Sequence, residues 1–248
     1  MAQTLIIAHR GASRQAPENT VPALEKAIAD GADVVALDVQ GTADHEPLVF
    51  ADTRLDRTTN QTGRLAQLTA KEARALDAGS WFAPEYAGTR IPTLAEGLKA
   101  LGAKTALMLV LPQLPAGSPL TAKVLEALKA RKKPEADVLV FPDSESLKAF
   151  REKAPGFGYI LALGEKVEGW VCVEKSLKLG LKAVRPYRAQ ATPALVRQAH
   201  EKGLKVLVHF ADEEDQMREL LKLHVDGIVT GRPERLQRVL REEAPAKG

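Results

Sequence analysis

Short apolar runs alternate along the chain with longer segments in which apolar residues recur at helical spacing. The apolar runs are expected strands, and they cover residues 4–8, 34–39, 48–50, 105–111, 136–141, 158–163, 183–186, 205–210 and 227–230. This alternation is typical of a parallel sheet wrapped by crossover helices. There is one run more than the strands of a (β/α)8 barrel, and the roughly eight residues between 39 and 48 are too few for a helical crossover. We therefore expect one of those two runs to depart from regular barrel order.

Helical periodicity is clearest in residues 21–30, 193–202 and 212–222. Thr20, Thr192 and Asp212 are the expected N-caps, because their side-chain oxygens can accept hydrogen bonds from the first N–H groups of a helix. Residues 52–93 differ from the rest of the chain, since turn-forming residues recur throughout them. We expect this segment to be an insertion over one end of the barrel, where long loops shape a pocket.

Length and composition favour a single barrel domain over residues 1–248. Lysine and arginine total 35 against 32 acidic residues, and the net charge of +3 is scattered along the chain, so nucleic acid is not an expected partner. Cys172 is the single cysteine, which excludes an internal disulfide and suits a reducing compartment. No apolar run reaches the roughly 18 residues that span a bilayer, and the first residues do not resemble a signal peptide. We expect a cytoplasmic protein.

Ionisable residues follow or interrupt several expected strands. His9 and Arg10 come directly after the first strand, at the rim where the active sites of such barrels lie. Histidine transfers protons near neutral pH and arginine offers a rigid fork to phosphate oxygens, so the pair suits a phosphodiester. Asp38 interrupts an apolar strand, where a carboxylate needs a cation or hydrogen-bond donors. Glu18 and Asn19 either form only the entrance to the first helix or support the rim around His9.

The motifs around these residues resemble the glycerophosphodiester phosphodiesterase family. They read IIAHRGAS at 6–13, PENT at 17–20, LDVQ at 37–40 and DTRLDRTT at 52–59, followed by insertion motifs at 77–84 and 91–94 and a last strand and turn at 225–233. The resemblance implies a (β/α)8 TIM barrel of the glycerophosphodiesterase and phosphatidylinositol phosphodiesterase type. In that family two histidines act as acid and base, a divalent cation held by two glutamates and an aspartate neutralises the phosphate, and a lysine adds further charge.

The resemblance also implies roles for individual residues. His9 matches the first catalytic histidine, Arg10 the phosphate-binding arginine, and Asp38 a metal ligand, with Asp52 as a further candidate ligand. Glu18 and Asn19 are implied to belong to the substrate-binding rim. Trp81 either contacts the glycerol side of a ligand or belongs to a local core.

Four positions lack the chemistry that the family requires. Ala36 stands where a glutamate is expected, and Ala51 stands where the second histidine is expected. Leu109 and Leu111 are assigned to another carboxylate and to the lysine. Residues 105–112 contain no ionisable side chain, so both groups are missing in any alignment. A period of two places Leu109 and Leu111 on one face of the strand, but whether this face is the barrel interior is open.

We expect a degraded catalytic site. One carboxylate offers a hard cation too few ligands, and losing one acid/base partner lowers a rate by about 10² to 10⁴. The expected protein is therefore a pseudoenzyme without a cofactor that binds a phosphorylated small molecule, such as a glycerophosphodiester, or a partner. The alternative is an active hydrolase that releases glycerol 3-phosphate and an alcohol, with Mg²⁺ or Ca²⁺ on Asp38 and on Asp52 or Glu18. That alternative needs His209, at the end of a late strand, as second histidine, although lining residues pack more often than they catalyse.

Overall fold

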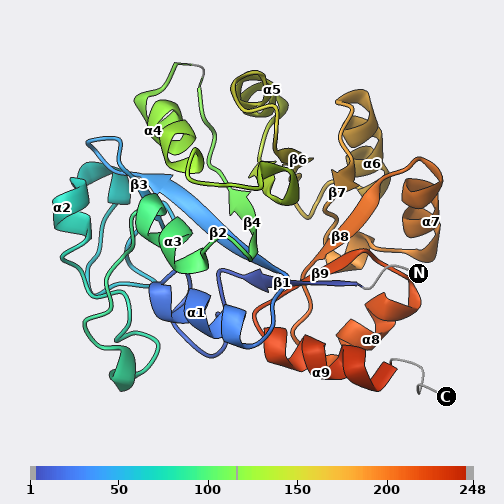
Figure 1. The fold of residues 1–248 in the computed structure, drawn as a ribbon, viewed down its shortest axis with the longest axis horizontal. Helices are drawn as coiled ribbons and strands as arrows, with labels where there is room; N and C mark the ends of the chain where they lie inside the picture. The colour runs from blue at the N-terminus through green and yellow to red at the C-terminus, as the bar shows by residue number, and fades with distance from the viewer. Residues whose placement is uncertain (1–3, 116, 244–248) are drawn as a thin grey trace.

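Eight parallel strands form a nearly closed barrel in the computed structural model, which describes residues 4–115 and 117–243 (Figure 1). Neighbouring strands follow the order β6-β5-β4-β2-β1-β9-β8-β7. Their bounds are Leu5–His9 (β1), Val34–Gly41 (β2), Ala106–Val110 (β4), Val138–Phe141 (β5), Gly158–Leu161 (β6), Ala183–Val184 (β7), Lys205–His209 (β8) and Gly227–Thr230 (β9). The TIM barrel predicted from the alternating pattern is confirmed.

Helices surround the strands (Figure 1). They are α1 (Val21–Ala29), α3 (Leu94–Leu101), α4 (Pro119–Leu128), α5 (Ser144–Lys153), α6 (Gly169–Lys178), α7 (Pro193–Glu201), α8 (Glu214–Lys222) and α9 (Pro233–Glu243). Apolar residues at helical spacing, such as Leu24 and Ala27 of α1, are buried against the strands. The helices therefore form an outer layer around the barrel.

The ninth predicted strand lies outside the barrel order. It is β3 (Pro47–Val49), which pairs antiparallel with the end of β2 through Val39 and Val49. A short hairpin connection is sufficient for an antiparallel pair, whereas a parallel neighbour needs a long crossover. The expectation that one of the two closely spaced runs departs from regular order is confirmed.

The barrel interior and the layer under the helices are separate apolar clusters. Alternate strand residues form the interior cluster, which includes Ile7, Val34, Ala36, Met108, Val140, Ile160, Leu207 and Val229. The intervening residues belong to two clusters that pack against the helices, for example Leu37 and Leu107 in one and Val206 and Ile228 in the other. Because both faces of these strands are buried, each strand reads as a continuous apolar run. The three clusters together settle which residues of each strand point inward.

Residues 52–93 contain the short elements η1 (Leu65–Gln67), α2 (Ala70–Ala73) and η2 (Pro84–Tyr86). Their apolar side chains form a small core together with Leu48 and Phe50. Asp77 organises one turn of this segment by accepting hydrogen bonds from the N–H groups of Gly79, Ser80 and Gly88 at 2.8 to 2.9 Å. The Ser80 hydroxyl and these N–H groups hold the pKa of Asp77 well below its ordinary value. The turns that the sequence indicates are thus fixed by specific hydrogen bonds.

The three predicted N-caps have different outcomes. Thr192 accepts a hydrogen bond from the N–H of Leu195 at 3.2 Å, as predicted. Thr20 occupies the N-cap position of α1, but its hydroxyl donates to the carbonyl of Pro17 at 2.5 Å. Asp212 is not a cap, since Glu213 precedes α8 and the Asp212 carboxylate accepts a hydrogen bond from the N–H of Gly231 at 2.8 Å. Other hydrogen bonds therefore replace helix capping at two of these positions, a local one at Thr20 and a long-range one at Asp212.

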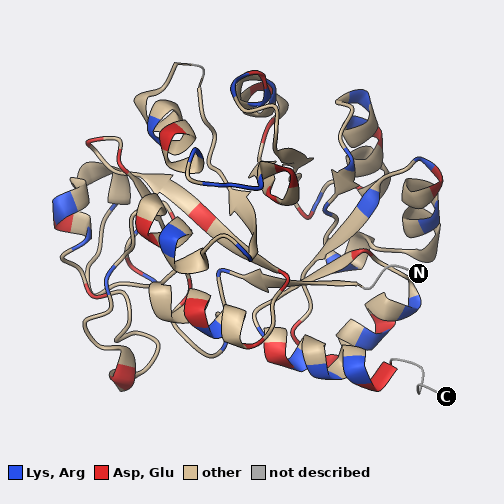
Figure 2. Ribbon diagram, viewed as in Figure 1, with Lys and Arg blue, Asp and Glu red and all other residues tan. Residues whose placement is uncertain are grey.

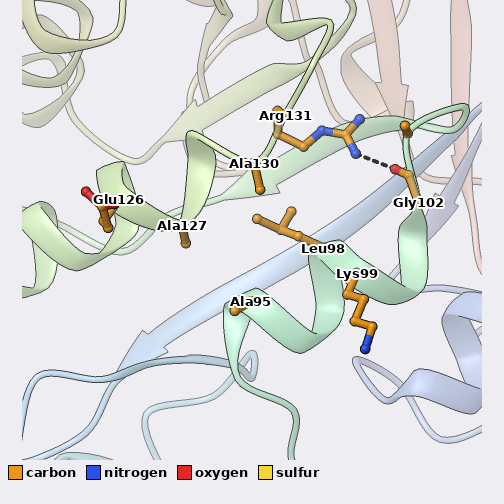
Figure 3. Close-up of a pocket in the computed structure, with 9 residues that line it drawn as sticks. Ala95, Leu98, Lys99, Gly102, Glu126, Ala127, Ala130 and Arg131 are labelled. Carbon is orange, nitrogen blue, oxygen red and sulfur yellow. Dashed lines mark hydrogen bonds between the residues drawn. The ribbon is translucent and has the colours of Figure 1, made fainter.

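A buried ion pair lies at the amino ends of β4 and β5. The Arg131 guanidinium binds the Asp137 carboxylate at 2.7 and 2.8 Å, and the two side chains are only 5% and 0% exposed. Arg131 also donates to the carbonyl of Gly102 at 2.7 Å (Figure 3). Asp137 accepts a further hydrogen bond from the N–H of Leu107 at 2.8 Å. A groove of about 430 Å³ beside Arg131 separates α3 from α4. These contacts join two strands and a helix end below the barrel core.

Charged residues of both signs are interspersed along the outer helices, most densely on α8 and α9 (Figure 2). Ion pairs such as Arg218 with Glu242 and Glu243 link these two helices. Within residues 4–115 and 117–243, no helix combines the length and apolar character needed to cross a membrane.

Candidate functional site at the barrel mouth

Five inward positions lie together at the carboxyl ends of the strands. They are His9, Asp38, Val110, Arg185 and His209. Each stands two residues after an inward residue of the same strand, and side chains two residues apart on a strand point to the same face. Active sites of TIM barrels lie at this end. Gly11 allows the segment after His9 to pass close to α1, because a Cβ there would lie 2.5 Å from the carbonyl of Ala23. In the His-Arg-Gly motif, His9 and Arg10 therefore supply polar groups at the mouth, and Gly11 permits the close packing against α1.

The two histidines are neighbours. The ring centroids of His9 and His209 lie 5.1 Å apart with the rings edge to face, and the ring of Phe210 stacks on His9 at 5.7 Å. Burial, supported by the charge of Arg10, lowers the pKa of His9 to about 4. Burial and the charge of Arg185 lower the pKa of His209 to about 2. Both rings are consequently neutral at neutral pH, where they can accept a proton but are poorly suited to donate one as an acid.

Five charged residues form a chain of ion pairs along the rim, which we call the rim chain: Asp38, Arg10, Glu18, Arg57 and Asp52. Arg10 contacts Glu18 at 2.6 Å and Asp38 at 2.8 Å. The contact with Glu18 is a hydrogen bond, whereas the Arg10 Nε has no hydrogen-bond partner and its contact with Asp38 is an ion contact only. Arg57 donates two hydrogen bonds of 2.7 Å to Glu18 and one of 2.6 Å to Asp52. Negative and positive groups thus alternate along the rim.

Glu18 sits between two arginines and remains ionised. Burial opposes ionisation, but the hydrogen bonds from Arg57 and the charge of Arg10 hold the pKa of Glu18 below its ordinary value. Asp38 is held in addition by Asn19, whose amide donates to the carboxylate at 3.1 Å and whose carbonyl accepts from the Asp38 N–H at 3.2 Å. Asn19 is 3% exposed, so it is a buried support of the rim.

The carboxylates of the rim do not fit a divalent cation. Asp38, Glu18 and Asp52 each contact at least one guanidinium group. A hard cation needs several free oxygen ligands that converge on one point. No cluster of three or more metal-ligating side chains occurs in the described part of the chain. Guanidinium groups thus hold both oxygens of Glu18 and one oxygen each of Asp38 and Asp52, and a metal would have to compete with them.

Ala36 and Ala51 are two of the four positions at which the resemblance implies a different residue. Ala36 is 3% exposed and belongs to the barrel interior, two residues before Asp38. Ala51 lies just beyond the β2–β3 pair, and its carbonyl accepts a hydrogen bond from the Gln40 side chain at 3.1 Å. Neither alanine offers a group that could bind a metal or move a proton.

The assignment of Leu109 and Leu111 to site positions is wrong by one residue. Both side chains belong to the cluster under the helices, so they point away from the barrel interior. The inward residues of β4 are Ala106, Met108 and Val110, and Val110 pairs with Asp38 of β2. The inward position beside Asp38 is therefore an apolar valine. Residues 105–112 contain no ionisable side chain, so this strand offers no carboxylate or lysine, whichever of its residues point inward.

Trp81 packs within the insertion. Its indole N–H donates to the carbonyl of Ala78 at 2.9 Å, and its ring meets that of Phe82 edge to face at 5.6 Å. The ring is 38% exposed. Among the described residues, no aromatic pair or hydrogen bond links Trp81 to His9 or His209. These contacts agree with a local core; ligand binding by Trp81 stays a prediction.

Sequence reasoning missed Arg185. This residue directly follows β7, and the carbonyl of the next residue, Pro186, accepts a hydrogen bond from the N–H of His209 at 2.8 Å. Arg185 is partly buried, and its Nε is buried without a hydrogen-bond partner. An arginine at the end of an apolar run was the available signal, of the same kind that singled out His9 and Arg10.

Comparison with known proteins agrees with this geometry. The sequence profile of the glycerophosphoryl diester phosphodiesterase family matches residues 9–235. The chain belongs to this family. A glycerophosphodiester phosphodiesterase of Caldanaerobacter subterraneus subsp. tengcongensis is 34% identical over 246 residues, covering 97% of this chain and 99% of the relative. One of Bacillus subtilis is 31% identical and covers 95% and 86%.

Solved structures of the family have the same fold. A phosphodiesterase of Oleispira antarctica in complex with the product sn-glycerol-3-phosphate superposes with a TM-score of 0.88, at 26% identity over 96% of this chain and 97% of that one. A glycerophosphodiester phosphodiesterase of Agrobacterium tumefaciens gives a TM-score of 0.80, at 28% identity over 94% and 99%. The TIM barrel of this family member is thus shared over nearly its whole length.

Proposed function

We propose that this member of the glycerophosphodiester phosphodiesterase family has lost the family's usual catalysis and binds a phosphorylated small molecule at the barrel mouth. The observation that carries the proposal is the combination of apolar inward positions, Ala36 and Val110, with carboxylates held by Arg10 and Arg57. A metal-assisted reaction would need these positions to supply ligands, and the second histidine position is Ala51.

The ligand class follows from the chemistry at the mouth and from a relative. Guanidinium groups and neutral imidazoles suit the oxygens of a phosphate ester. The Oleispira antarctica protein binds sn-glycerol-3-phosphate. We therefore take glycerol 3-phosphate and glycerophosphodiesters as the ligand class of this chain. The buried free thiol of Cys172 suits a reducing compartment, so we place the protein in the cytoplasm.

A second function has one observation in its favour. His9 and His209 are in edge-to-face contact at the mouth, so His209 is available as a replacement for the missing histidine. In that hydrolysis, water attacks phosphorus, the bond from phosphorus to the alcohol oxygen breaks, and the proton lost by water ends on the alcohol. The low pKa of both rings limits them as acids. Mg²⁺ or Ca²⁺ on Asp38 would also have to compete with Arg10.

The test measures hydrolysis of glycerophosphocholine by purified protein with Mg²⁺, Ca²⁺ or Mn²⁺ and with chelator, and binding of sn-glycerol 3-phosphate by calorimetry. We expect binding without metal-dependent turnover. Turnover that disappears in His9→Ala and His209→Ala would replace the proposal with the hydrolase. His45→Ala, at an exposed turn, is the matched control for both histidine variants.

A further inference from the structure

Arg185 differs from the other two arginines of the mouth because no described residue serves as its acidic partner. Arg10 and Arg57 each contact two carboxylates of the rim chain. Over residues 4–115 and 117–243, no carboxylate lies within 4.0 Å of the Arg185 guanidinium, and its side chain donates no hydrogen bond. A partly buried cation without a partner is unfavourable, because no ion pair or hydrogen bond offsets the free energy of its desolvation.

The position of Arg185 at the end of β7 places its charge on the inward face of the strand. Ala183, two residues earlier on β7, belongs to the group of side chains packed on the interior cluster. The positive charge of Arg185 depresses the protonation of the neighbouring His209, whose Nδ1 is also buried without a hydrogen-bond partner. An arginine and an imidazole that both lack partners therefore adjoin at one side of the mouth.

The charges of the mouth identify the missing group as an anion. The rim chain holds three carboxylates and two guanidinium groups, so it leaves no positive charge free for a ligand. Arg185 adds the one guanidinium whose donors are not engaged by described residues. Its planar fork matches two oxygens of a phosphate group. Arginine stays protonated in proteins, so this charge is permanent at physiological pH.

We propose that Arg185 is the main phosphate-binding residue of this chain and that it binds the phosphate of the ligand without a metal ion. This inference rests on the proposed function and names the residue on which it depends. Arg185 thus supplies the positive charge that a bound cation would otherwise bring to the ligand. Phe210, 38% exposed and stacked on His9, offers an apolar surface for the alcohol part of the ligand.

The experiment measures binding of inorganic phosphate and of sn-glycerol 3-phosphate by calorimetry in EDTA. Wild type, Arg185→Met and Arg185→Lys are compared, with Arg188→Met as the control because Arg188 is an exposed arginine three residues away. We expect Arg185→Met to weaken binding by about tenfold to a hundredfold, because two charge-assisted hydrogen bonds are lost. Arg185→Lys keeps the charge but not the fork and should be intermediate. The control should bind like wild type.

Thermal unfolding without phosphate separates a binding role from a structural one. Arg185→Met should unfold at the wild-type temperature or above it, since the change removes an unpaired cation. A clear loss of stability would show that Arg185 has a structural partner and would overturn the inference. Equal phosphate binding by wild type and Arg185→Met would refute the inference alone and leave the proposed function standing. Absence of binding by wild type would refute both, and binding only with Mg²⁺ would refute the metal-free site.

Discussion

Rebuilding a cation site in this barrel is a stringent test of which residues face its interior. Ala36 is inward and two residues from Asp38 on the same strand, which corresponds to a separation of about 6.5 to 7 Å. Val110 pairs directly with Asp38 across about 5 Å. Glutamates at positions 36 and 110 would therefore converge with Asp38 on one point. We expect the double variant Ala36→Glu/Val110→Glu to bind Mg²⁺ or Ca²⁺, whereas wild type does not.

The size of the effect follows from linkage between binding and unfolding. In chelator, the added buried carboxylates repel one another, so the double variant should be less stable than wild type. A cation at about a hundred times its Kd stabilises the folded state by about 2.7 kcal/mol. For a chain of this length, this corresponds to a rise in Tm of about 5 to 11 °C. Thermal unfolding with 0 and excess Mg²⁺ measures the rise directly.

The matched control moves one glutamate by a single residue. In Ala36→Glu/Leu109→Glu the second carboxylate points toward the helices, where Leu109 is fully buried. That variant should lose stability and gain no response to the cation. The reasoning is refuted if both double variants respond equally, or if wild type shows the same rise in Tm as the Val110 variant.

Three further predictions concern groups outside this comparison. Asp137→Asn should lower the free energy of unfolding by about 3 to 5 kcal/mol in denaturant titrations, because it breaks a fully buried pair with Arg131; a loss under about 1 kcal/mol would contradict this. The ring signals of His9 and His209 in NMR spectra should not titrate between pH 7.5 and 5.5. Since the unfolded chain binds more protons than the folded one between pH 6.5 and about 4, stability should fall as the pH drops through this window, by up to about 1.4 kcal/mol per unit for each ring. Burial raises the pKa of the Cys172 thiol, so alkylation at pH 8 should be slow in the native protein and fast in guanidinium chloride.

The fold was largely predictable because the alternation of apolar runs and helical segments has few solutions. The spacing between β2 and β3 even indicated that one of these two runs leaves the barrel order. Local details were less predictable. Thr20 and Asp212 resemble N-caps in sequence, but each side chain makes another hydrogen bond in the folded chain. Capping preferences of about 1 kcal/mol are easily outweighed by such contacts.

The candidate site was predictable where a polar residue interrupts an apolar run. His9 and Asp38 stand out in this way and lie at the mouth as expected. The faces of β4 could not be assigned, because an all-apolar strand buried on both sides carries no alternation. The role inferred for Arg185 depends on its having no acidic neighbour among the described residues of the folded chain. No local pattern of the sequence shows this.

The apolar positions beside Asp38 and the rim chain are consistent with each other in electrostatic terms. A partly buried carboxylate such as Asp38 requires a positive charge nearby, whichever group brings it. With Ala36 and Val110 beside it, Asp38 is left without companions for a cation, and Arg10 fills that need from within the chain. A metal would then have to displace a guanidinium held at 2.8 Å and gain few other ligands. Arg185, by contrast, has no carboxylate among the described residues to displace. An anion gains an unpaired guanidinium at the mouth while a cation must compete with a paired one, so the charges of this site favour phosphate over metal.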